Sequence, residues 1–171
     1  RSRSEQRYNH LVLLCQNQEG YRNLIQLVST SYLDGFYYKP RIDKDLLASH
    51  SKGLIALSAC LKGEINEILK QEQYDDARRR AYQYQDMFGR GNFFLEVQDH
   101  GLDDDRVVIP QLNRLAAETG IPLVATNDSH YLRAADSRAH EVLLCISTGK
   151  TMSDPSRLRY KDAEFFLKSR Q

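Results

Sequence analysis

Short apolar runs alternate with stretches of helical periodicity along most of this chain. The runs are residues 10–15 (HLVLLC), 53–60 (GLIALSAC), 92–97 (NFFLEV) and 122–126 (PLVAT), each about as long as a buried strand. Between them, apolar residues recur at helical spacing, as Leu24, Leu27 and Val28 do. The pattern predicts helices over 19–32, over 63–88 with a break near 73–75, over 104–119 and over 134–148.

Four successive strand-then-helix units predict an α/β fold, a parallel sheet joined by helical crossovers. The nearly continuous apolar strands agree, because parallel strands are buried on both faces. An open doubly wound sheet and part of a (β/α) barrel both remain open as closures. In either case, functional side chains are expected at the carboxyl ends of the strands.

The predicted strand ends carry side chains capable of chemistry. Cys60 ends the second run, Asp99 and His100 follow the third, and Asp128 and His130 follow the fourth. Because Asp128 and His130 are two positions apart, a continued strand would point both to one face, where they suit a divalent metal or general-base chemistry. The structural alternatives are an inert core thiol at Cys60, a turn and helix cap at 99–101, and a helix cap at Asp128.

The other histidines give weaker signals. His140 lies within a predicted helix beside apolar residues and is expected to be structural. His50 ends a short polar helix and is expected to be solvated. His10 begins a strand instead of ending one, so the carboxyl-end rule does not account for it.

Composition narrows the class of protein. A chain of 171 residues can bury one sizeable core, and no apolar run approaches the ~20 residues of a membrane span. Three widely spaced cysteines argue against a disulfide framework and fit a reducing cytoplasm. With 24 basic and 23 acidic residues, the net charge of +1 lacks the excess of a domain that grips nucleic acid alone. The opening RSRS and the closing KSRQ suggest a piece of a longer protein.

Several longer segments of the sequence resemble one family. They are HLVLL at 10–14, EGYRNL at 19–24, GFYYKPR at 35–41, GLIALSACL at 53–61, LEVQDHG at 95–101, ATNDSHYL at 125–132, LLCISTGK at 143–150 and DPSRLRY at 154–160. In this order they closely resemble the PHP (polymerase and histidinol phosphatase) domain at the amino end of bacterial DNA polymerase III alpha subunits.

The resemblance implies a fold and its boundaries. Such domains are distorted (β/α)7 barrels, so this chain is expected to be a partial PHP-type barrel that lacks the first strands. Residues 1–150 would form the C-terminal part of the PHP domain, and residues 151–171 would begin the connection toward the polymerase core.

The resemblance also implies a metal centre. His10, Cys60, Asp128 and His130 match metal-ligand positions of the family, and Asp128 and His130 are expected to be catalytic. The family's other ligands are absent here, so the cluster of up to three divalent ions is expected to be incomplete. The mixed His/Cys/Asp set favours zinc, with manganese, iron or magnesium as alternatives.

The activity implied is metal-dependent 3′→5′ exonucleolytic proofreading beside a DNA polymerase. The expected partners are DNA, the remaining polymerase domains of the same chain, the sliding clamp and other replisome subunits, without a membrane. Lys39 and Arg41 would contact DNA or a neighbouring domain, unless they are solvated loop charges. Two alternatives remain: a structural PHP module without chemistry, and a free-standing PHP phosphoesterase.

Overall fold

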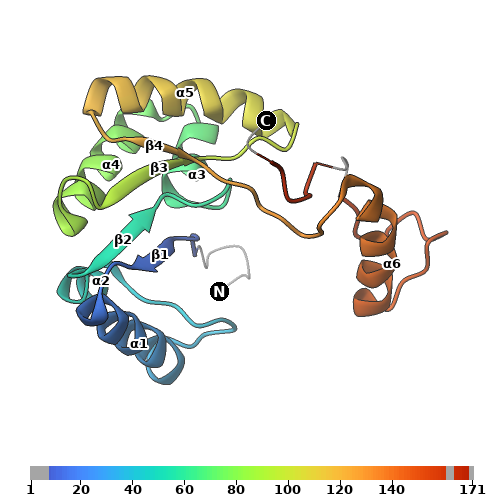
Figure 1. Ribbon diagram of the computed structural model, residues 1–171, viewed down its shortest axis with the longest axis horizontal. Helices are drawn as coiled ribbons and strands as arrows, with labels where there is room; N and C mark the ends of the chain where they lie inside the picture. Colours follow the sequence, from blue (N-terminus) through green and yellow to red (C-terminus); the bar gives the residue numbers. More distant parts are fainter. Residues whose placement is uncertain (1–7, 161–163, 170–171) are drawn as a thin grey trace.

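The computed structural model describes residues 8–160 and 164–169. Within these residues, four strands form one sheet in the order β1-β2-β3-β4 (Figure 1). The strands are β1 (Val12–Cys15), β2 (Leu54–Leu57), β3 (Phe93–Val97) and β4 (Leu123–Ala125). The α-helices are α1 (Gln18–Leu33), α2 (Lys44–Ser49), α3 (Glu64–Lys70), α4 (Tyr74–Phe88), α5 (Asp103–Thr119) and α6 (Ser137–Thr148), with a 3₁₀ turn, η2 (Ala134–Asp136), before α6.

The α/β class and the alternation of elements are confirmed. Each predicted strand and helix is present within a few residues of its expected bounds, including the break between α3 and α4. Asn17 caps α1 by accepting a hydrogen bond from the backbone N–H of Gly20, and Gly120 ends α5 in the left-handed conformation.

The sheet is only partly parallel, which corrects the prediction of parallel strands throughout. The pairs β2–β3 and β3–β4 are parallel, whereas β1 and β2 are antiparallel, with Val12 opposite Leu57 and Cys15 opposite Leu54. In a parallel strand–helix–strand unit, the crossover helix returns the chain to the amino end of the sheet, so the next strand runs in the same direction. Between β1 and β2 the chain passes through α1, the loop 34–43 and α2, so β2 begins beside the end of β1.

The hydrophobic core lies between the sheet and the helices α3, α4 and α5. Most of its largest fully buried side chains come from β2, β3 and these helices, including Leu54, Ile65, Leu69, Phe93, Leu95, Leu112 and Leu115. Helix α1 packs against β1 and β2 and contributes Leu27. Strand β4 is half exposed and completes one edge of the sheet.

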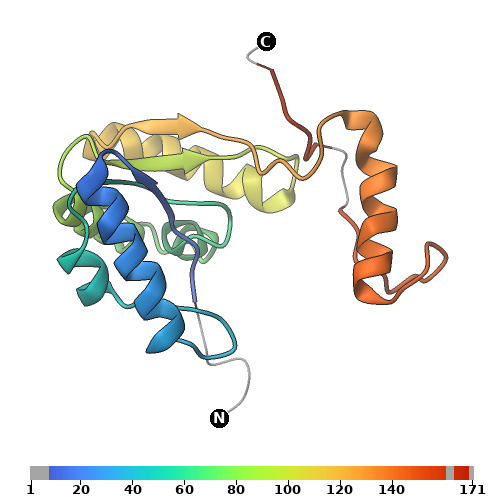
Figure 2. The same cartoon turned by 60° about the horizontal axis from the view of Figure 1, so that its bottom comes forward.

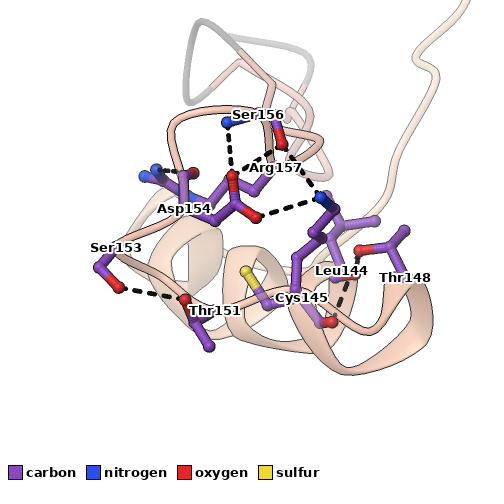
Figure 3. A network of polar contacts seen from close by, with 9 residues as sticks. Leu144, Cys145, Thr148, Thr151, Ser153, Asp154, Ser156 and Arg157 are labelled. Carbon is purple, nitrogen blue, oxygen red and sulfur yellow. Dashed lines mark hydrogen bonds and ion pairs between the residues drawn. The ribbon is translucent and has the colours of Figure 1, made fainter.

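Helix α6 stands apart from the sheet, as both ribbon views show (Figures 1 and 2). Only Cys145 of this helix is buried, and its thiol lies 3.6 Å from the sulfur of Met152. The loop after the helix folds back over its C-terminal end (Figure 3). There Asp154 accepts hydrogen bonds from the hydroxyl and the backbone N–H of Ser156 and pairs with Lys150. These contacts, the Ser156 hydroxyl first among them, hold the pKa of the Asp154 carboxyl below its ordinary value.

The segment 164–168 returns to the sheet end. The carbonyl of Phe165 accepts hydrogen bonds from the backbone N–H groups of His130 and Tyr131, and Leu167 N–H donates to the carbonyl of Tyr131. The Phe165 side chain is buried. This segment therefore packs against the 128–131 loop; the assignment of 151–171 as a connection toward a polymerase core stays a prediction.

Candidate functional site

The antiparallel direction of β1 places His10 at the same edge of the sheet as the carboxyl ends of β2, β3 and β4. His10 forms a parallel bridge with Gly63, and its backbone N–H donates to the carbonyl of Lys62 at 3.0 Å. His10, which precedes β1, thus lies beside Cys60, which follows the neighbouring strand β2. This geometry explains why His10 departed from the carboxyl-end rule.

A cavity of about 760 Å³ opens at this edge. Three of the sequence-predicted ligand residues line it, namely His10, Cys60 and Asp128. The Cys60 thiol lies 3.5 Å from Nδ1 of His10. A thiol, an imidazole and a carboxylate from distant parts of the chain therefore share one pocket.

The loop that carries Cys60 is tightly built. Strand β2 ends at Leu57, three residues earlier than predicted, and Ala59 adopts a left-handed conformation with φ of 66°. A Cβ at Gly63 would lie 2.0 Å from the carbonyl oxygen of Ser58, so the chain can close this turn only with glycine. Asn66 from α3 donates to the carbonyls of Ala59 and Cys60 at 3.2 and 2.9 Å.

The Asp128–His130 pair lies beyond the end of β4. The two side chains approach within 3.8 Å, Nδ1 to Oδ1, although the chain between them is not a strand. His130 Nδ1 lies 2.8 Å from the carbonyl oxygen of Asp128, and His130 Nε2 lies 2.9 Å from the hydroxyl of Tyr160. Both ring nitrogens of His130 are thus engaged, and its ring packs among Tyr160, His140 and Phe165.

His100 is buried and contacts the backbone of the loop that carries Asp128. Its ring stacks on Phe165 with an interplanar angle of 2°, and its Nε2 accepts a hydrogen bond from the backbone N–H of Asp128 at 3.3 Å. Burial lowers the pKa of His100, and the nearby carboxylates of Asp105 and Asp128 oppose this only partly. A neutral His100 fits its role as an acceptor.

The turn predicted at 99–101 is confirmed. Asp99 accepts from the backbone N–H of Gly101, and Asp105 accepts from those of His100 and Leu102 at the start of α5. His140, in α6, packs against the rings of Tyr131 and Tyr160, as expected for a structural residue. His50, at the end of α2, was expected to be solvated but is only partly exposed, and its Nδ1 lies 3.1 Å from the carbonyl oxygen of Leu46.

Basic side chains border the pocket. Lys39 and Arg41 both line it, although each also lies over a tyrosine ring, Tyr8 at 5.1 Å and Tyr37 at 5.2 Å. A hydrogen bond from Lys39, together with its charge, lowers the pKa of Tyr8. The carboxylates of Asp43, Glu64 and Asp128 line the same pocket, so its charge is mixed.

The structure adds residues that the sequence did not single out. Gln98 and Lys44 line the pocket, and Tyr160 contacts His130. Gln98 follows β3 at a carboxyl end, so its position was available as a signal. Tyr160 is thirty residues from His130 in the chain, and no spacing links the two.

The donor set fits a transition metal in kind but not in number. Imidazole and thiolate nitrogen and sulfur are ligands that zinc and related ions take, with a carboxylate oxygen as a third. Across residues 8–160 and 164–169, however, no three His, Cys, Asp or Glu side chains are grouped closely enough to hold an ion. The roles of His10, Cys60, Asp128 and His130 as ligands stay predictions.

In the part of the chain that the structure describes, no helix combines the length and apolar character needed to cross a membrane.

Sheet topology and pocket together define an α/β domain whose polar side chains gather where three strands end and one begins. The chain belongs to the PHP domain family, whose model matches residues 2–100. The resemblance inferred from the sequence segments is therefore confirmed.

The relatives agree on one kind of protein. The chain is 52% identical over 163 residues to the DNA polymerase III subunit alpha of Treponema pallidum. The aligned region covers 95% of this chain and 14% of the relative. It is 46% identical to the Helicobacter pylori (strain J99) subunit, covering 97% of this chain and 14% of the relative, and 48% identical to the Deinococcus radiodurans subunit, covering 94% and 12%. The chain thus spans about one seventh of the length of these curated relatives.

Proposed function

We propose that this chain forms part of the PHP domain of a bacterial DNA polymerase III alpha subunit, and that its pocket is a metal-dependent 3′→5′ exonuclease site. The observation that carries the proposal is the pocket itself. His10 and Cys60 are paired at 3.5 Å, and Asp128 lines the same cavity beneath a rim that includes Lys39 and Arg41.

The proposed fold is a distorted (β/α)7 barrel, of which these strands are one part. Within the residues that the structure describes, the sheet has β1 and β4 as its edges. Further strands that pair with these two edges would close the barrel and protect edges otherwise open to other chains. Closure would also bring further ligands to the same end of the sheet.

His10, Cys60 and Asp128 would hold the metal ions, of which zinc suits the sulfur ligand best and manganese, iron and magnesium are the alternatives. Bound ions would supply Lewis acidity toward a phosphodiester. His130 lies beside Asp128 and can present Nε2 as a ligand only when Tyr160 leaves it. At least one ligand beyond His10, Cys60 and Asp128 is needed for each complete centre.

Lys39 and Arg41 would bind and orient the DNA phosphates. The net charge of +1 gives little general attraction for DNA, so local cations at the pocket must supply it. The proposed setting is the bacterial cytoplasm, where the remaining polymerase domains, the sliding clamp and other replisome subunits would be the partners. Nucleotide addition would reside in those other domains.

One observation favours a second candidate, a PHP module that braces the polymerase without chemistry. Both ring nitrogens of His130 are engaged. Among the described residues, no three His, Cys, Asp or Glu side chains lie close enough together to hold one metal ion. The matched relatives reported above are polymerase subunits, which leaves the free-standing phosphoesterase without support.

Elemental analysis of a full-length alpha subunit that carries these residues separates the two candidates. The nuclease proposal expects two or three transition metal ions per subunit, and Asp128→Ala abolishes exonuclease activity while polymerase activity remains. Asp86→Ala, on the exposed side of α4, is the matched control and retains both activities. A subunit without stoichiometric metal would exclude the metal-dependent nuclease and leave the bracing role as the remaining candidate.

A further inference from the structure

A second, much smaller cavity lies behind the Cys60 loop, between the ends of β2 and β3 and helix α5. It has a volume of about 10 Å³, and its lining includes Cys60, Asn66, Glu96, Gln98 and Asp105. This volume is close to that of a single water-sized occupant. Ala59, Cys60 and Gln98 line both this cavity and the larger pocket.

Two buried oxygen atoms at this cavity accept no hydrogen bond from any residue that the structure describes: Oδ1 of Asn66 and Oε2 of Glu96. Asn66 is 3% exposed and Glu96 is 4% exposed, so bulk water does not reach them. Leaving such an oxygen without a partner is unfavourable, and buried polar groups are therefore almost always paired.

The donors near these oxygens are already used. The side-chain amide of Asn66 donates both of its hydrogen bonds to the carbonyls of Ala59 and Cys60. Gln98 donates to Oε1 of Glu96 at 3.2 Å and to the hydroxyl of Thr126 at 3.0 Å. Thr126 also donates to Oε1, so the Oε2 atom of Glu96 is left over.

The charge balance points the same way. Glu96 and Asp105 are buried carboxyl groups that line the cavity, and its lining contains no lysine, arginine or histidine. Asp105 is matched by two backbone N–H groups at the start of α5. Glu96 Oε2 has no such match, and Glu96 lines the same small cavity as Asn66.

We propose that this cavity binds one water-sized occupant, an internal water molecule or a small monovalent cation, which bridges Asn66 Oδ1 and Glu96 Oε2. The shared chemistry of both occupants is that they offer positive charge to oxygen atoms. Through Asn66, whose amide holds the carbonyls of Ala59 and Cys60, the occupant fixes the Cys60 loop beside His10.

This inference goes beyond the proposed nuclease function and does not depend on it, because both its measurements use protein free of transition metal ions. The first is a crystal structure of the full chain, grown once with sodium and once with thallous ions. A single density peak within hydrogen-bond distance of both oxygens supports the proposal. Anomalous signal from thallium at that peak identifies a cation site, and its absence identifies water. An empty cavity, or direct contact between the two oxygens, overturns the proposal.

The second measurement is the alkylation rate of Cys60, followed by peptide mass spectrometry in the full chain. Asn66→Leu removes the amide clamp, and the rate at Cys60 should rise roughly tenfold as the loop loosens. Asn66→Asp, which keeps the shape but loses the donors, should show the same direction of change if the leucine variant folds poorly.

Asn92→Leu is the matched control. Asn92 also donates its amide to a backbone carbonyl, that of Phe88, but at the amino end of β3 and away from the cavity. It should leave the Cys60 rate unchanged. Equal rates in the wild-type and Asn66→Asp proteins, with both folded, would remove the link between the occupant and Cys60.

Discussion

Glu64 shows how one carboxylate can join three elements. It accepts hydrogen bonds from Lys44 of α2 and from the hydroxyl of Tyr84 of α4, both at 2.7 Å, and lies 3.0 Å from Nε of Arg80. Burial, followed by the hydrogen bond to Glu64, raises the pKa of Tyr84 well above its ordinary value. The phenol is therefore protonated at neutral pH, as its donation to Glu64 requires.

Replacing Glu64 by Gln should lower the free energy of unfolding by about 1–2 kcal/mol, because two partly buried cations lose their counter-charge. Urea denaturation at neutral pH measures the change. Glu19→Gln is the control: its partner Lys52 is mostly exposed, so the loss should stay below about 0.5 kcal/mol. Equal losses in the two variants would mean that the Glu64 cluster adds nothing beyond a surface pair.

The buried His100 gives the protein a predictable dependence on pH. Its pKa in the folded state lies below the unfolded value of about 6.5, chiefly because of burial. The unfolded state therefore takes up a proton first as the pH falls. The contribution of His100 is present in full above about pH 6.5 and is lost as the pH falls toward the folded pKa.

The free energy of unfolding should accordingly decrease between about pH 7.5 and 5.5, as urea titrations at each pH would show. His100→Gln should reduce this slope, and His140, whose pKa burial also lowers, should account for part of the remainder. An unchanged slope in His100→Gln would show that His100 is not the group responsible.

At the scale of single elements, the sequence predicted strands and helices well and strand ends less well. The extent of α1 and α5 follows from apolar periodicity, a cap at Asn17 and a glycine at 120. The end of β2 was misplaced because Ala59 turns the chain in a left-handed conformation that alanine seldom adopts. No residue pattern announces such a turn.

Helix α1 is held to the sheet by a close contact between two glycines. A Cβ at Gly20 would lie 1.7 Å from the carbonyl oxygen of Gly53, which precedes β2. Within a helix, Gly→Ala ordinarily stabilises a protein by about 0.5–1 kcal/mol. Here the backbone contact should reverse that sign.

Gly20→Ala should therefore destabilise the protein by about 2 kcal/mol or more, since the helix must move away from β2. Thermal or urea unfolding measures the change. Ser29→Ala, on the exposed side of the same helix, should remain within about 0.5 kcal/mol of wild type. A stabilised Gly20→Ala protein would contradict the packing argument.

At the scale of the whole molecule, the direction of β1 was the feature that the sequence could not provide. Alternation of strands and helices does not distinguish a single crossover from one that contains α1, a loop and α2. That extra reversal makes β1 antiparallel, and it brings His10 to Cys60. The convergence of these two residues was expected only from the resemblance to the PHP family, and strand counting would have separated them.

The segment 164–168 supplies a second long-range connection that local patterns do not reveal. Phe165 is 5% exposed and packs between His100 of the sheet end and the rings of His130 and Tyr160. Its backbone carbonyl holds the chain at His130, and Lys168 donates to the carbonyl of Asp99. The 128–131 loop is therefore fixed by residues more than thirty positions later in the sequence.

Phe165→Ala should lower the free energy of unfolding by about 3 kcal/mol, as expected for the loss of a buried aromatic ring. Hydrogen exchange at residues 128–131 should speed up in the same variant, because the loop loses the surface against which it packs. Leu167→Ala is the control, since Leu167 is 61% exposed, and its unfolding and exchange should match wild type. If exchange at 128–131 stays slow in Phe165→Ala while stability falls, then β4 and His100 alone hold the loop that carries Asp128 and His130, and the returning segment serves only to cover them.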